Sequence, residues 1–105
     1  MVKRMVLVRR RPDLSVAEFA DYWVNVHAKI GQRLRGIRGY RINIVTKWLN
    51  LTDSQSAWDG IAELWFDSEE EMDAALAEYR LELTADSENF LSEIQVAIVR
   101  EHRAV

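Results

Sequence analysis

The sequence predicts an α+β fold of the ferredoxin-like kind, in which two helices cover one face of a four-stranded antiparallel sheet. Segments with strand-like alternation and segments with helical spacing follow one another in the order β-α-β-β-α-β. Two capping sequences mark where the helices begin. The chain of 105 residues contains no linker or low-complexity stretch, so residues 1–105 are expected to form a single domain.

Four segments predict strands. They alternate along the chain, are rich in β-branched and aromatic residues, and are bounded by turn-forming residues. These segments are residues 3–10, 39–48, 60–66 and 93–101. In the second of them, alternation places Tyr40 on one face of the sheet and Asn43 on the other.

Two segments predict helices, and a capping box opens each of them. The boxes pair Ser15 with Glu18 and Ser68 with Glu71, so that each serine accepts a backbone hydrogen bond and each glutamate reaches back. The helices are expected to end near residues 29 and 80, and a short helical piece is expected over residues 86–91.

The first helix carries one histidine beside an apolar stripe. The stripe positions i, i+4, i+7 and i+11 are Phe19, Trp23, Val26 and Ile30. His27 follows Trp23 by one turn, and an imidazole held in a cavity can act as a general acid or base near neutral pH. The alternative is a structural histidine, because the C-terminal end of a helix stabilises an imidazolium.

Five further residues are candidates for a substrate site. Tyr40 could hydrogen-bond a carbonyl or an enolate, or pack as a core aromatic. Trp23 could line a pocket, and Trp65 could wall a pocket or fill a dimer core. Glu63 shares the face of Trp65, where it either pairs with an arginine or acts as an acid inside the cavity. Asn43 is a further polar candidate on the second strand.

The composition excludes several classes of site and location. The chain has no cysteine, and its two histidines are separated by most of the sequence, so we expect no metal site. No glycine-rich phosphate loop or Ser/His/Asp arrangement occurs, and we expect no cofactor. The basic and then apolar start is interrupted at Arg9, which predicts neither a secretory signal nor a membrane span and favours the cytoplasm.

Charge and hydrophobicity both indicate pairing of surfaces. Residues 1–48 hold 11 Lys and Arg against 3 Asp and Glu, and residues 49–105 hold 3 against 14. An arginine surface for nucleic acid is one interpretation, but no nucleic-acid motif accompanies it, so we expect the halves to neutralise each other within the chain or across a dimer.

Several strands are apolar on both faces, which predicts a homodimer packed sheet to sheet.

Separated motifs along the chain carry a family signature. They are Phe19, Tyr22-Trp23, His27-Ala28, Gly39-Tyr40, Trp58 to Ser68, and Glu88 to Leu91. In order and spacing these motifs resemble the EthD family, including methylmuconolactone methylisomerases and fungal EthD-type cyclases and dehydratases. The resemblance implies a dimeric α+β barrel with a cofactor-independent pocket between sheet and helices and with His27 inside it. Some related barrels bind haem, for which His27 would be the axial ligand.

Three hypotheses about function follow. The first is cofactor-free acid/base catalysis, as an isomerase, cyclase or dehydratase, on a small apolar oxygenated substrate such as a lactone or ketone. In it His27 moves the proton, Tyr40 stabilises the oxyanion, and Trp23 and Trp65 shape the pocket. The second is an oxidoreductase, either a cofactorless monooxygenase or an accessory to an oxygenase pathway of ether or other xenobiotic degradation. The third is a non-enzymatic, ligand-binding dimer.

Overall fold

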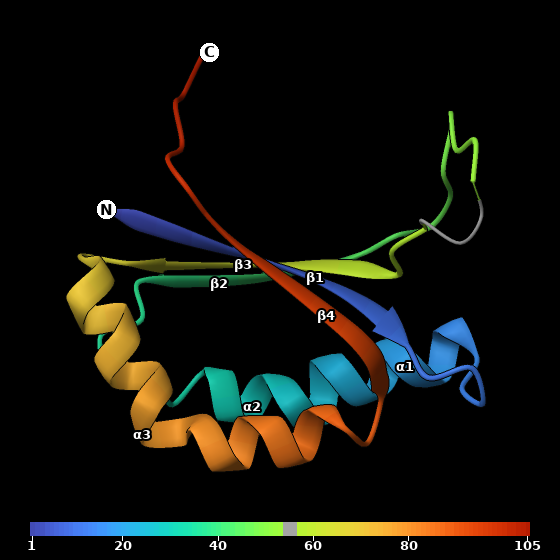
Figure 1. The fold of residues 1–105 in the computed structure, drawn as a ribbon, viewed down its shortest axis with the longest axis horizontal. Helices are drawn as coiled ribbons and strands as arrows, with labels where there is room; N and C mark the ends of the chain where they lie inside the picture. The colour runs from blue at the N-terminus through green and yellow to red at the C-terminus, as the bar shows by residue number, and fades with distance from the viewer. Residues whose placement is uncertain (54–56) are drawn as a thin grey trace.

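The computed structural model describes residues 1–53 and 57–105 and has the predicted order of elements (Figure 1). The strands are β1 (Val2–Arg10), β2 (Gly39–Ile44), β3 (Gly60–Phe66) and β4 (Leu91–Val99). The first helix runs without a break through α1 (Val16–Tyr22), η1 (Trp23–His27) and α2 (Ala28–Gly31), and α3 spans Glu69–Ser87. The sheet is antiparallel with strand order β2-β3-β1-β4, and the helices lie together on one of its faces. The α+β, ferredoxin-like prediction is confirmed.

Neighbouring strands set where the outer strands end. The second strand stops at Ile44 rather than at residue 48, because its partner β3 begins at the paired residue Gly60. The last strand covers Leu91–Val99 rather than residues 93–101, because its pairing with β1 reaches only to Lys3 opposite Val99. Each of these strand ends therefore coincides with the end of the pairing to the inner strand beside it.

The second helix is longer than predicted. It continues past Arg80 to Ser87, so the separate helical piece expected over residues 86–91 does not form. No glycine or proline interrupts residues 80–87, and Leu83 packs against the core, which gives the extra turns a reason to remain helical. Of the second capping box, the bond from the Glu71 N–H to the Ser68 hydroxyl is present at 3.1 Å. This extension carries Asp86 to the end of the first helix.

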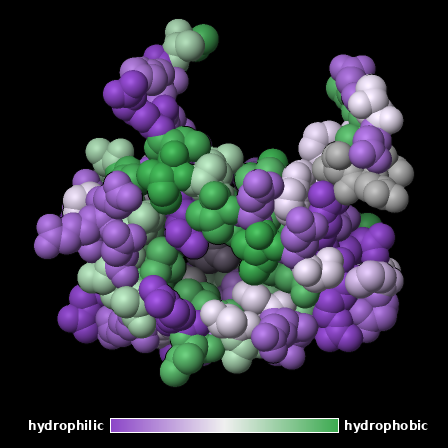
Figure 2. Space-filling model, in the orientation of Figure 1, coloured by the Kyte–Doolittle hydropathy of each residue, from purple (hydrophilic) through white to green (hydrophobic). Residues whose placement is uncertain are grey.

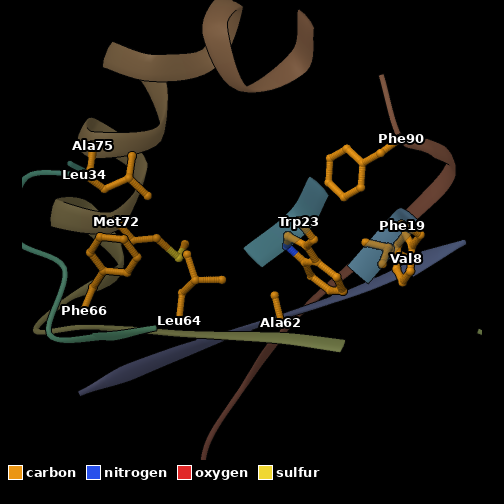
Figure 3. Packing of buried hydrophobic residues seen from close by; sticks show 10 residues of the cluster. All are labelled: Val8, Phe19, Trp23, Leu34, Ala62, Leu64, Phe66, Met72, Ala75 and Phe90. Atoms are coloured by element: carbon orange, nitrogen blue, oxygen red, sulfur yellow. The ribbon is translucent and has the colours of Figure 1, made fainter. Parts of the chain in front are cut away.

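The core lies between the helices and one face of the sheet. On β3 the buried residues alternate, with Ala62, Leu64 and Phe66 pointing toward the helices. Figure 3 shows two gatherings of core side chains, one around Trp23 and Phe90 and the other around Phe66 and Met72. Both helices are thereby fixed over the same face of the sheet.

A π-helical turn interrupts the first helix at the segment that carries His27. The Ala28 N–H donates to the carbonyl of Trp23, five residues earlier, and this wider turn holds one more residue than an α-turn. The prediction that Val26 continues the apolar stripe is wrong, since this side chain is 44% exposed. The extra residue shifts the inward position by one, and His27 takes that place with only 12% of its side chain exposed.

The other face of the sheet is not covered by the described part of the chain. We call it the open face; β1 presents Met5 and Leu7 to it and β3 presents Ile61, by alternation with the buried positions. The C-terminal residues rise on this side, away from the helices (Figure 1). They are held there by Glu101, which accepts a hydrogen bond from Lys3 at 2.8 Å.

Ion pairs join the basic first half of the chain to the acidic second half. Arg9 contacts Glu93 at 2.6 Å, and Arg38 contacts Asp67 at 2.7 Å. Opposite charges from the two halves therefore pair within one chain, which is one of the two alternatives expected from the sequence. No helix in residues 1–53 and 57–105 has both the length and the apolar character needed to cross a membrane.

Candidate functional site

A cavity of about 420 Å³ lies between the helix-facing side of the sheet and the helices, within the size range of small-molecule sites. Figure 2 shows a hollow near the middle of the molecule, bordered by hydrophobic side chains and by some hydrophilic ones. The lining residues are mostly apolar and include Val6, Val8, Trp23, Leu34, Ala62, Leu64, Leu76, Leu83, Phe90, Ile94 and Val96. Five residues with titratable side chains also line it, namely Arg4, His27, Tyr40, Glu88 and Glu93.

His27 is oriented by a carboxylate from the other helix. Its Nδ1 lies 2.7 Å from Oδ2 of Asp86, a residue with 16% of its side chain exposed. The second oxygen of Asp86 accepts a hydrogen bond from the hydroxyl of Tyr22 at 2.6 Å, and Asn89 donates to that hydroxyl at 3.0 Å. The imidazole also packs against Phe90, with 4.9 Å between ring centroids. Hydrogen bonding and packing together fix the ring plane.

The charge state of Asp86 determines what His27 can do. Burial raises the pKa of Asp86, but the hydrogen bonds from Tyr22 and His27 outweigh it, and the net pKa lies below its ordinary value of 3.8. An ionised carboxylate can only accept, so neutral His27 carries its proton on Nδ1. Nε2 is then left unprotonated on a ring that lines the cavity, which is the state a general base requires.

Tyr40 supplies a hydroxyl group to the same cavity. It lies on the helix-facing side of β2, as the alternation predicts, and its ring packs against Gly31 at the end of the first helix. Burial raises the pKa of Tyr40 above its ordinary value of 10.0, with a smaller opposing effect from a hydrogen bond with Trp23. The phenol therefore stays neutral, and because the Trp23 indole can only donate, the hydroxyl proton of Tyr40 remains free for a ligand.

The sheet separates the remaining predicted residues from this cavity. Asn43, Glu63 and Trp65 lie on the open face, on the opposite side of the strands from Tyr40 and Leu64. Glu63 forms its ion pair with Lys3, at 3.6 Å, rather than with an arginine. The structure therefore brings His27, Tyr40 and Trp23 together and places the other three in a different environment.

Sequence reasoning missed two residues of the site. Asp86 is 59 positions from His27, and nothing in its local sequence distinguishes it from the other acidic residues of α3. Arg4 lies in a strand that is apolar on both faces, where its face could not be assigned until the helices were placed. Within the described ranges, no group of three or more His, Asp or Glu side chains is arranged to hold a metal ion.

Comparison with known proteins extends these observations. The family model of the EthD domain matches residues 11–94. An EthD family protein from Bacillus halodurans is similar in structure, with a TM-score of 0.74, 16% identity, and coverage of 97% of this chain and 100% of that one. An EthD-like protein from Ralstonia eutropha gives a TM-score of 0.70 at 15% identity, covering 98% and 96%.

A dimeric ferredoxin-like protein of unknown function from Bacteroides fragilis gives a TM-score of 0.66 at 13% identity, covering 95% of both chains. No curated protein is similar enough in sequence to match. At identities of 13–16% these structures support the fold alone. The family model supports membership of the family, because it covers most of the chain. The chain belongs to the EthD family.

Proposed function

We propose that this protein is a cofactor-independent acid/base catalyst acting on a small, largely apolar, oxygenated molecule such as a lactone or an enolisable ketone. The observation that carries the proposal is the hydrogen bond between Asp86 and His27 at the wall of a mostly apolar cavity. A histidine held in one tautomer by a carboxylate is a common arrangement for proton transfer.

The proposed reaction needs only one proton shuttle. Nε2 of His27 removes a proton from a carbon next to a carbonyl group, and the electrons of the C–H bond move into the enolate. Tyr40 donates a hydrogen bond to the enolate oxygen, where the negative charge develops. Return of the proton to a different carbon gives isomerisation, whereas attack of the enolate on an internal electrophile or loss of a leaving group gives cyclisation or dehydration. Trp23 and the apolar walls contact the apolar part of the substrate.

We further propose that the protein acts as a homodimer that pairs its open faces. Met5, Leu7 and Ile61 lie there without cover from the described part of the chain, and the similar protein from Bacteroides fragilis is dimeric. Trp65, Glu63 and Asn43 would then contribute to the contact between sheets rather than to the cavity. The cavity of each protomer would then lie on the side of its sheet away from this contact.

The test uses the two histidines of the chain as a matched pair. A panel of enolisable ketones and lactones in D₂O is followed by NMR for deuterium exchange and isomerisation. We expect His27→Gln to lower the rate at least about 100-fold, whereas His102→Gln, in the exposed C-terminal segment, leaves it unchanged.

Three results would overturn the proposal. The first is equal rates in the two histidine variants. The second is oxygen consumption in place of exchange, lost in His27→Gln, which would make the protein a cofactorless monooxygenase. The third is saturable binding of panel members with no turnover, which would make it a ligand-binding dimer.

A further inference from the structure

One cationic side chain in the cavity has no use in the proposed proton transfer. Arg4 lies in β1 on the face toward the helices, in one row across the sheet with Tyr40, Leu64 and Ile98. It is partly buried and lines the same cavity as His27 and Tyr40.

Among the partly buried lysines and arginines of the described ranges, Arg4 differs in lacking a carboxylate partner. Lys3, Arg9 and Arg11 each contact a carboxylate at 2.8 Å or less, and Arg10 contacts Asp59 at 3.4 Å. Arg4 makes no hydrogen bond or ion pair with any residue in the described ranges, and the charge of Asp73 acts on it only from a distance. Burial lowers the pKa of Arg4, which shows the cost of holding this charge away from water, although a guanidinium stays charged at neutral pH.

A partly buried charge without a protein partner is costly, and an anionic ligand would remove that cost. A guanidinium binds a carboxylate through two parallel hydrogen bonds, which also fixes the orientation of the ligand. Arg4 and Tyr40 are separated by one intervening strand, so their Cα atoms are about 10 Å apart. A small molecule can therefore reach both side chains from one position in the cavity.

We propose that Arg4 binds a carboxylate of the substrate, so that the site takes oxo acids or carboxylated lactones whose carbonyl group lies at Tyr40. This inference rests on the proposed acid/base function and narrows its substrate class. The two glutamates at the cavity wall do not oppose it, since Glu93 is paired with Arg9 at 2.6 Å and Glu88 is exposed to solvent.

The test compares acids with their uncharged methyl esters. Binding of 2-oxo-, 3-oxo- and 4-oxo-4-phenylbutanoate and of each ester is measured by calorimetry. We expect wild-type protein to bind at least one acid about 10- to 100-fold more tightly than its ester. Arg4→Met should abolish that preference with little change for the ester, and Arg4→Lys should keep part of it. Arg35→Met is the matched control, because Arg35 is an exposed arginine outside the cavity and should keep the full preference.

The inference is overturned if no acid binds better than its ester, or if Arg4→Met keeps the preference of the wild type. Folding of Arg4→Met is checked by urea denaturation, in which removal of an unpaired, partly buried charge should not lower stability. The assay also separates the two proposals. If Arg4→Met loses the acid preference but His27→Gln leaves deuterium exchange unchanged, the anion site is supported and the acid/base function is refuted. If Arg4→Met keeps the acid preference but His27→Gln loses exchange, the acid/base function is supported and the anion site is refuted.

Discussion

Replacing Asp86 by asparagine tests the hydrogen bond between Asp86 and His27 directly. The carboxylate accepts one hydrogen bond from Tyr22 at 2.6 Å and one from His27 at 2.7 Å. An amide oxygen can keep the first, but the amide nitrogen facing Nδ1 can only donate, so the imidazole must move its proton to Nε2. The variant therefore loses the charge-assisted bond and leaves His27 in the tautomer that cannot act as a base.

The expected magnitude follows from that one lost bond. A hydrogen bond to a charged group is worth about 1.5–3 kcal/mol, which for a domain of this size lowers Tm by roughly 6–24 °C. Turnover of a substrate found in the exchange panel should fall by about 10²–10⁴-fold. Asp67→Asn is the matched control, because that carboxylate pairs with Arg38 at the exposed surface and its loss should leave stability nearly unchanged.

The dependence on pH gives the prediction a second readout. Because the folded-state pKa of Asp86 is below 3.8, its ionised form stabilises the fold above that pH, and the contribution is lost as the pH falls through the folded value. Urea denaturation at pH 7, 5 and 3 should therefore show the difference between wild type and Asp86→Asn shrinking at the acidic end. Equal stability and equal turnover for Asp86→Asn and Asp67→Asn at pH 7 would refute the reasoning.

Two further predictions concern packing and assembly. A Cβ on Gly60 would overlap the indole of Trp23 and come within 3.0 Å of the carbonyl oxygen of Asn43, so Gly60→Ala should lose about 1–3 kcal/mol in urea denaturation; unchanged stability would show that Trp23 is free to move. Leu7→Glu adds a charge to the open face, so sedimentation should show a dimer for wild type and a folded monomer for the variant; a monomeric wild type at micromolar concentration would refute the pairing of open faces.

Much of the fold could be predicted because its signals are local. Ser15 and Glu18 form the expected capping box, with bonds of 3.1 and 2.9 Å, since the partners are three residues apart in any helix that starts there. The same holds for the face of Tyr40, which alternation fixes within one strand. The ends of strands and helices are harder to predict from the sequence. The strands β2 and β4 stop where their pairing with the inner strands stops, and α3 continues for as long as side chains such as Leu83 pack against the core.

The sequence by itself determined the order of the elements, the histidine on the first helix and the tyrosine that opens the second strand. Only the tertiary structure decided that a π-turn rotates His27 inward, that Asp86 reaches it from α3, and that the sheet separates Trp65 from the cavity. Capping, alternation and helical spacing act over a few residues, and the sequence shows them directly. The position of Asp86 depends on helix length and packing between segments 59 residues apart, which only the assembled core defines.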